Sequence, residues 1–260
     1  MAYQTITATN MELQCGIMIK CVATGEPVGE VSSVVLKKRY AGASVWKNIA
    51  TVEINTVSDF TFTHFDADTR SGATYNYVVV PVIDEVEQPG VLATCKCEFG
   101  GIYIGDSTGS WISLYNNEYS MQKNTQVSYI TTLAGKFPRR VSNASTDYLS
   151  GSVTGLFLPF TETGFPMKEK AREYKDAVLQ MLTNGKAKLL KTYDGNAWIV
   201  SVDATPKENF SLFDGASTIS FNWTQIGEVE APPKTIQENV GADFDINYDG
   251  SVSFRTVAMT

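Results

Sequence analysis

One segment near the C-terminal end has a helical period, while the chain around it has the period of β-strands. Apolar residues recur at steps of three and four from Met167 to Met181, and charged residues fill most of the positions between them. This spacing places the apolar side chains on one face of a helix. Asn184-Gly185 then favours the left-handed backbone that ends a helix. The sequence predicts one amphipathic helix over 167–183, flanking a sheet in a subunit that packs against copies of itself.

The rest of the chain predicts a mainly β protein of more than one domain. At 260 residues it is longer than a typical single domain. Between residues 10 and 99, short apolar or alternating runs are separated by turn residues, which is typical of an antiparallel sandwich. These runs are 16–23, 31–40, 44–54, 60–67, 74–83 and 91–99.

The segment 60–83 carries a Ser-Gly-x-x-Tyr-x-Tyr-x-Val run, beginning at Ser71. It resembles the corner between the fifth and sixth strands of fibronectin type III domains. The resemblance implies that the hydroxyl of Tyr75 bonds back to the backbone. The family's tryptophan on the second strand is missing here, and Ile17 or Ile19 must fill its space. We therefore expect an immunoglobulin-like (fibronectin III-like) sandwich over 1–100.

After Gly100-Gly101 the pattern changes. Two apolar stretches joined by a Gly-Asp-Ser-Thr-Gly turn predict a hairpin over 101–124. A polar stretch follows, and it predicts a long loop over 131–147, of the kind that often carries contacts. A second hairpin turns at Asp194-Gly195, and a strand closes the segment at 217–228.

The order of these elements from residue 101 resembles tail proteins of long-tailed bacteriophages, of the tail-tube and distal-tail (baseplate hub) group. The run 188–200, with its Tyr-Asp-Gly-Asn turn, and the closing Phe-Asn-Trp-Thr-Gln-Ile-Gly strand carry the resemblance. It implies a β-sandwich or split-barrel domain over 101–232 with one flanking α-helix. The remaining residues, 233–260, form a C-terminal extension with a β-hairpin.

The same resemblance implies a structural protein of the virion tail, made in the host cytoplasm. Such subunits pack side by side into a ring, commonly hexameric, and DNA passes through the lumen. The expected partners are further copies of the chain and other phage tail and baseplate proteins. The fibronectin-like part departs from the simplest family members, so tube, hub and peripheral baseplate positions stay open.

The charge balance agrees with passage of DNA rather than its binding. The chain has 21 basic and 28 acidic residues, giving a net charge of −7 and a pI of about 4.9. A protein that grips phosphates concentrates positive charge on one face, and no such patch is visible. A negatively charged conduit lets DNA slide without sticking. No apolar run approaches the roughly 18 residues of a membrane helix, so no membrane contact is expected.

No catalytic or cofactor motif is readable. The single histidine, His64, lies in a strand without a nucleophile elbow or a papain-like cysteine context. A glycine-rich phosphate loop is missing, so no cofactor is expected. The four cysteines lack the paired C-x-x-C spacing of zinc knuckles, and we expect reduced, mostly buried thiols. The sequence predicts a protein without enzymatic activity.

One segment has the start of a calcium loop. Asp245, Asn247 and Asp249 precede Gly250, as oxygen ligands do in the first half of an EF-hand. Position twelve, normally a bidentate acid, is Thr256, and the apolar residues around the motif alternate. A hairpin turning at Asp249-Gly250 is the preferred interpretation, and calcium binding is the alternative.

Subunit contacts are expected at strand edges and in the 131–147 loop. Phe137, Arg139 and Arg140 offer an aromatic ring and two guanidinium groups, which pair with carboxylates of a neighbour. A solvated loop tip is the alternative. The rival function is a carbohydrate- or receptor-binding adhesion module. Its sugar platform would be Tyr103, Trp111, Tyr115 and Tyr119, although alternating aromatic residues more often pack in a core.

Overall fold

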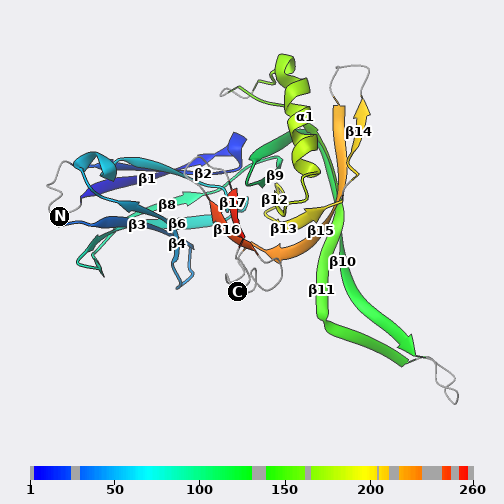
Figure 1. Cartoon of the computed structure of the whole chain (residues 1–260), viewed down its shortest axis with the longest axis horizontal. Coiled ribbons are helices and arrows are strands. Elements are labelled where there is room, and N and C mark those ends of the chain that lie inside the picture. The colour runs from blue at the N-terminus through cyan, green and yellow to red at the C-terminus, as the bar shows by residue number, and fades with distance from the viewer. Residues whose placement is uncertain are drawn as a thin grey trace.

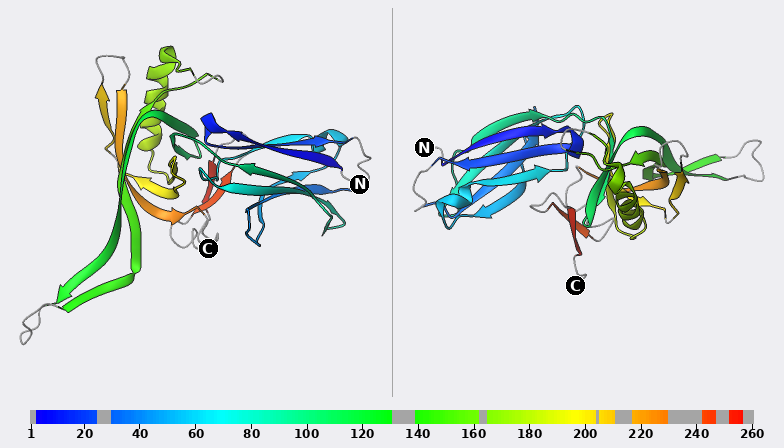
Figure 2. Two further views of the ribbon diagram at one scale, coloured as in Figure 1. Left: turned by 180° about the vertical axis from the view of Figure 1, so that it is seen from behind. Right: turned by 90° about the horizontal axis from the view of Figure 1, so that it is seen from above.

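The computed structural model describes residues 3–24, 30–130, 139–161, 165–203, 205–210, 217–229, 242–246 and 252–256. It is mainly β, with several antiparallel sheets and one α-helix in the described part. A sandwich lies at one side of the molecule and a barrel at its centre. A long two-stranded arm leaves the barrel on the side away from the sandwich (Figures 1 and 2).

Two sheets face each other in the sandwich. The first has the order β1-β2-β5, and the second has the order β4-β3-β6, with β7 and β8 both pairing with β6. The strands are β1 (Gln4–Met11), β2 (Gly16–Ala23), β3 (Ser33–Tyr40), β4 (Lys47–Glu53), β5 (Phe62–Asp66), β6 (Thr74–Ile83), β7 (Val86–Glu87) and β8 (Val91–Lys96). This is the immunoglobulin-like, fibronectin III-like arrangement that the sequence predicted.

The expected corner is present. The backbone N–H of Arg70 donates a hydrogen bond to the hydroxyl oxygen of Tyr75 over 2.9 Å. Ile17 and Ile19 are fully buried in the sandwich core, where the family places its tryptophan. The sequence analysis missed β1, because Ile6 is the one large apolar residue among its alternating threonines.

The second part of the chain forms a closed barrel. Each of its six strands pairs antiparallel with the next, in the order β9-β10-β11-β15-β13-β12 and back to β9. The strands are β9 (Ile102–Asp106), β10 (Gly109–Ile130), β11 (Arg139–Phe157), β12 (Lys188–Lys191), β13 (Ala197–Val202) and β15 (Ser217–Glu228). A short strand, β14 (Lys207–Phe210), pairs with the start of β15. Closure leaves few unpaired edges in the barrel wall.

Large apolar side chains fill the barrel, and one face of the helix packs against them. The helix α1 (Ala171–Leu182) follows a 3-10 turn at Lys168–Lys170, so it begins later than the sequence predicted. It buries Val178 and Met181 in the same apolar cluster as the stacked indoles of Trp198 and Trp223, whose ring centroids are 5.0 Å apart. The helix ends before Gly185, whose φ of 74° is the left-handed conformation expected there.

The predicted long loop over 131–147 is wrong for its second half. Residues 139–147 belong to β11, which pairs with β10 far beyond the barrel wall. This stretch is polar and Ser/Thr-rich, so it lacks the apolar alternation that marks a half-buried strand. Between Thr125 and Val127 of β10 the register shifts by three residues, since their partners are Asp147 and Ser142, and such a bulge bends strands.

The C-terminal strands β16 (Ala242–Ile246) and β17 (Val252–Thr256) pair antiparallel, with Ile246 opposite Val252. This is the pairing of the expected hairpin. The backbone of Asp245 pairs with Ser253 within the hairpin. Asn247 and Asp249 lie outside the described residues, and the calcium alternative stays a prediction.

Candidate assembly surface

The arm formed by β10 and β11 extends beyond the barrel, and its strands have few partners in a single subunit. Pairing between β10 and β9 stops at Ser113, and pairing between β11 and β15 begins at Ser150. Beyond these points β10 and β11 pair only with each other within the described residues. The arm therefore presents two unpaired edges along most of its length (Figure 1).

Two-stranded ribbons of this kind are only marginally stable in water. This one also exposes large apolar side chains, with Tyr129 67% and Ile130 53% exposed toward the tip and Met121 49% exposed nearer the barrel. A ribbon with free edges and exposed aromatic and aliphatic groups is suited to pairing with another chain.

The predicted interface residues map to the end of this arm. Arg139 and Arg140 lie in β11, where their backbones pair with Ile130 and Tyr129 of β10. Their side chains are not part of the described structure, and Phe137 lies outside the described residues. The sequence analysis placed these residues in a loop, whereas the two arginines are at the end of a strand.

The root of the arm is tied to the barrel hairpin at Asp194-Gly195. The hydroxyl of Tyr119 donates a hydrogen bond to the carboxylate of Asp194, and the Tyr119 ring meets the edge of Tyr193 at a centroid distance of 6.1 Å. Asn196 Nδ2 donates to the same carboxylate over 2.8 Å. These contacts fix the direction in which the arm leaves the barrel.

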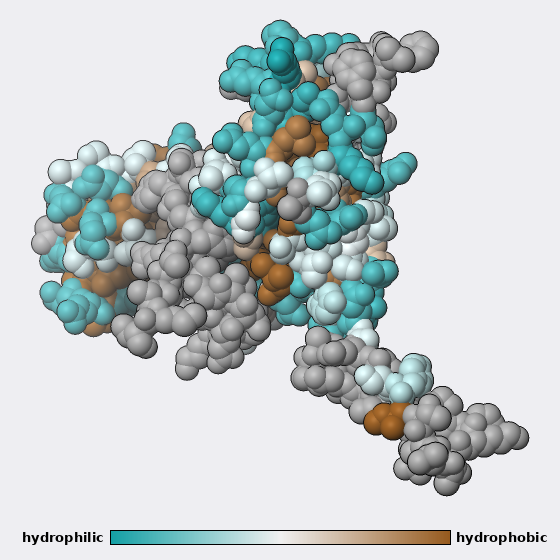
Figure 3. All heavy atoms as spheres, turned by 45° about the vertical axis from the view of Figure 1, so that its right-hand side comes forward, coloured by the Kyte–Doolittle hydropathy of each residue, from teal (hydrophilic) through white to brown (hydrophobic). Residues whose placement is uncertain are grey.

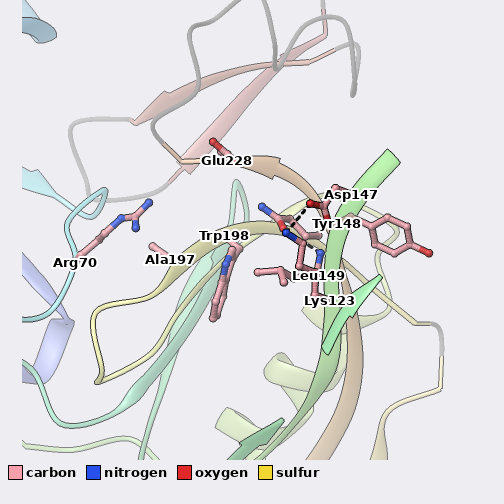
Figure 4. Close-up of a pocket in the computed structure, with 9 residues that line it drawn as sticks. Arg70, Lys123, Asp147, Tyr148, Leu149, Ala197, Trp198 and Glu228 are labelled. Carbon is pink, nitrogen blue, oxygen red and sulfur yellow. Dashed lines mark hydrogen bonds and ion pairs between the residues drawn. The ribbon is translucent and has the colours of Figure 1, made fainter. Parts of the chain in front are cut away.

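A cleft of about 380 Å³ lies beside the root, between the barrel rim and the sandwich corner. Lys123 and Asp147 form an ion pair of 2.7 Å on one side of it, and Arg70 approaches from the sandwich (Figure 4). Leu149 N–H donates to Gln225 Oε1 over 3.1 Å, which holds the start of the arm against β15. The cleft is lined by Arg70, Lys123, Asp147, Tyr148, Leu149, Ala197, Trp198, Gln225 and Glu228.

The sandwich and barrel are joined by a buried lysine. The ammonium of Lys191 in β12 donates hydrogen bonds to the backbone carbonyls of Cys15 and Ala67 in the sandwich, the latter over 2.6 Å. It also lies over the rings of Phe99 and Tyr103, at 5.2 and 4.6 Å from their centroids. Burial lowers the pKa of Lys191. The sequence analysis gave no signal for this contact, since its partners are backbone atoms distant in the chain.

The histidine and three of the four cysteines are core residues, whereas Cys95 is half-buried. His64 is 2% exposed in the sandwich, and burial lowers its pKa. Burial raises the pKa of Cys15 and of Cys21 to about 12, so neither is a thiolate at neutral pH. Cys97 is also fully buried. Within the described residues, no group of three His, Cys, Asp or Glu side chains could hold a metal ion.

The aromatic residues proposed as a sugar platform do not form an exposed row. Tyr103 is 1% exposed and packs between barrel and sandwich. Trp111 and Tyr119 are partly buried against the barrel core. The side chain of Tyr115 is outside the described part. The platform interpretation is wrong for Tyr103, because its face of β9 is covered by the sandwich.

Comparisons with known proteins identify no family for this chain. No family model and no curated protein match it. Among solved structures, it is similar to a chain of "Titin kinase and its flanking domains" (10% identity, TM-score 0.28, 85% of this chain and 37% of that one). It is also similar to a chain of "Virion of native gene transfer agent (GTA) particle" (14% identity, TM-score 0.29, 49% of this chain and 92% of that one). A third similar structure is "Twitchin kinase region from C.elegans (Fn31-NL-kin-CRD-Ig26)" (13% identity, TM-score 0.28, 85% of this chain and 39% of that one).

The chain spans less than two fifths of the titin and twitchin chains, 37% and 39% of their lengths. Overlaps with TM-scores this low carry no argument about function. No helix in the described part of the chain has the length and apolarity that a membrane span requires. The arm, its root and the faces of the barrel therefore supply the functional argument.

Proposed function

We propose that this chain is a non-enzymatic, structural subunit of a phage tail or baseplate that assembles with its own copies into a ring. The observation that carries the proposal is the arm. Its free strand edges and exposed Tyr129 and Ile130 are unfavourable in a monomer. They become favourable when a neighbouring subunit adds strands to them or covers them.

The closed barrel also bears on how subunits would contact one another. It closes on itself through the β11–β15 pairing, so its own wall needs no partner. An arm on one side of a closed body contacts a different surface of the next copy, which is a head-to-tail contact. Such contacts generate rings when the rotation closes. The six-fold order is what the tail-protein resemblance implies.

Passage of DNA through the ring is the finer part of the proposal. The subunit carries a net charge of −7, so a lumen built from it repels the phosphate backbone and does not hold it. The subunit would be made in the host cytoplasm and act in the virion tail, with other tail and baseplate proteins above and below it.

The test is the mass of the purified assembly. Light scattering and negative-stain images of the wild-type chain are expected to show closed rings or stacked tubes. A shortened variant joins Lys123 to Leu149, which are opposite each other in register, through an Asn-Gly turn that replaces 124–148. It is expected to stay monomeric with an unchanged melting temperature, because the barrel pairing is retained.

Point substitutions test the arm tip. Arg139→Ala with Arg140→Ala is expected to weaken assembly several-fold without unfolding the subunit. The matched control removes two exposed cations from the helix start, Lys168→Ala with Lys170→Ala, and is expected to assemble normally. A monomeric wild-type chain, or a shortened variant that still forms rings, would contradict the proposal.

A further inference from the structure

The core of the sandwich contains a pair of oppositely charged side chains. Charged residues usually stay in water, and hydrophilic residues, in teal, cover much of the surface around the helix in Figure 3. Lys38 of β3 and Asp66 of β5 are exceptions, since they are 6% and 0% exposed. Lys38 shares its face of β3 with the fully buried Leu36, two residues earlier. The sandwich thus encloses an ammonium and a carboxylate among apolar side chains.

The ammonium and the carboxylate are in direct contact. Nζ of Lys38 lies 2.8 Å from Oδ1 of Asp66 and 3.0 Å from its Oδ2, and it also donates to the backbone carbonyl of Asp68. The carboxyl carbon between the two oxygens is therefore within the separation of about 3 to 3.5 Å from which positioned groups react. The pair bridges the two sheets, because β3 belongs to one and β5 to the other.

Two neighbouring groups are placed to assist an addition to this carbon. The hydroxyl of Tyr77 donates a hydrogen bond of 2.8 Å to Oδ2 of Asp66. Such a donor stabilises the negative charge that develops on the oxygen when a carboxyl carbon is attacked. The carboxylate of Asp68 lies 3.3 Å from the ammonium of Lys38, and its side chain is 10% exposed. At this distance it can accept a proton from the amine and return it.

We infer that Lys38 and Asp66 form an isopeptide bond after the sandwich has folded. The ammonium of Lys38 first passes a proton to the carboxylate of Asp66 along their hydrogen bond of 2.8 Å. The neutral amine then adds to the carboxyl carbon. Asp68 takes a proton from the attacking nitrogen and returns it to the departing hydroxyl. An amide forms between Nζ and Cγ, the bond from Cγ to the hydroxyl breaks, and one water molecule leaves, so the step needs neither an oxidant nor a cofactor.

The buried site favours the amide over the ion pair. Taking two charges out of water costs free energy that their attraction offsets only in part, and a neutral amide removes both charges from the core. Exclusion of water also removes the reagent that would hydrolyse the amide. Burial lowers the pKa of Lys38, but the carboxylates of Asp66 and Asp68 raise it, and the net shift is upward. The ion pair is therefore the main form of a freshly folded chain, and the amide accumulates slowly from the minor neutral form.

Intact mass spectrometry of the full chain tests for the bond. The mass of the purified chain is measured at once and again after incubation at neutral pH. The wild type is expected to end lighter than its sequence by the mass of one water molecule. In tryptic digests, the peptides that contain Lys38 and Asp66 are expected to run as one branched species. Cleavage after Lys38 is expected to stop, because trypsin requires a free lysine amine.

Two variants test the residues of the reaction. Lys38→Arg keeps a positive charge beside Asp66, but its guanidinium stays protonated and cannot add to the carboxyl carbon. It is expected to keep the full mass of its sequence, and circular dichroism checks that it folds. Tyr77→Phe is expected to fold and to form the bond at least about tenfold more slowly, because it lacks the hydroxyl that stabilises the developing charge.

The chain contains its own control. Lys123 and Asp147 form an ion pair of 2.7 Å, but their side chains are 66% and 42% exposed. Water keeps both of these groups charged, so they are expected to remain unlinked in the same digests.

A wild-type mass that stays equal to its sequence after incubation would overturn the inference. The same loss of mass in Lys38→Arg would also overturn it, because the water would then come from another site. If Lys38→Arg does not fold, the wild-type digest decides, since the branched peptide identifies both linked residues. An unchanged rate in Tyr77→Phe would remove the role given to its hydroxyl.

Discussion

The ammonium of Lys191 in the barrel donates a hydrogen bond of 2.6 Å to the backbone carbonyl of Ala67 in the sandwich. Lys191 is fully buried, and the carbonyl of Cys15 accepts a second bond from it. Cys15 has a φ of 54°, which is uncommon for a residue with a side chain. One barrel side chain thus bonds two sandwich carbonyls, one of them in a left-handed turn.

Replacing Lys191 by methionine is expected to lower the free energy of unfolding at pH 7 by about 2 kcal/mol, because two buried carbonyls lose their donor. The pKa of Lys191 is lower in the folded chain than in the unfolded chain. Between the two values the unfolded chain binds more protons, so the wild type gains stability relative to the variant as pH rises toward 10. Urea unfolding of both proteins at pH 7, 8.5 and 10 measures this difference, and a constant difference would contradict it.

Replacing Tyr75 by phenylalanine is expected to destabilise the sandwich by about 1 to 2 kcal/mol, since the N–H of Arg70 then loses the acceptor it has at 2.9 Å. Tyr193→Phe is the control, because Tyr193 is 45% exposed and its hydroxyl can exchange its bonds for water. Thermal unfolding of both variants gives the comparison. Equal melting temperatures would show that the corner bond contributes nothing.

Gly195→Ala is expected to be more destabilising than Gly185→Ala. Both glycines have positive φ, 90° and 74°, so both substitutions strain the backbone by about 1 kcal/mol. An added Cβ at Gly195 would also lie 2.7 Å from the carbonyl oxygen of Ser71, whereas one at Gly185 meets nothing within 4 Å. Urea unfolding gives the free energy of unfolding of both variants. The additional loss of stability in Gly195→Ala, relative to Gly185→Ala, measures the close contact between the barrel hairpin and the sandwich.

Asp66→Ala is expected to cost about 3 kcal/mol, because it removes the carboxylate that lies 2.8 Å from the buried ammonium of Lys38 and leaves that ammonium paired with Asp68 alone, at 3.3 Å. Burial raises the pKa of Asp66, but the charge of Lys38 and the hydrogen bond from Tyr77 together lower this pKa by more than burial raises it. The pKa of Asp66 is therefore below its ordinary value. A carboxylate with a lowered folded pKa stabilises fully above its ordinary pKa, and this contribution is lost as pH falls through the folded value.

Acid unfolding measures that loss. The wild type is expected to lose stability as pH falls below about 4, while Asp66→Ala loses less over the same range. Asp176→Ala, at an exposed position of the helix, is the control and is expected to follow the wild type. Parallel acid curves for wild type and Asp66→Ala would contradict this account.

The local parts of the fold were predictable, and the arm was not. The helical stripe, the left-handed Gly185 and the Tyr75 corner each depend on residues close in sequence, and each was predicted with small errors of boundary. Residues 139–147 were taken for a loop because their polar, Ser/Thr-rich sequence has no apolar alternation. The predicted interface arginines accordingly lie on a strand, at the end of an arm whose length no spacing indicated.

Side-chain period and the backbone freedom of residues such as Gly195 were enough to place the helix, the turns and most strands, because these depend on neighbours in the chain. Strand β1 and residues 139–147 were missed, since neither has a regular alternation of large apolar residues. The pairing of β11 with β15 and the bond from Lys191 to the carbonyl of Ala67 became visible in the folded chain alone. Strand order and register depend on contacts between distant residues, and a single sequence records no such pairs.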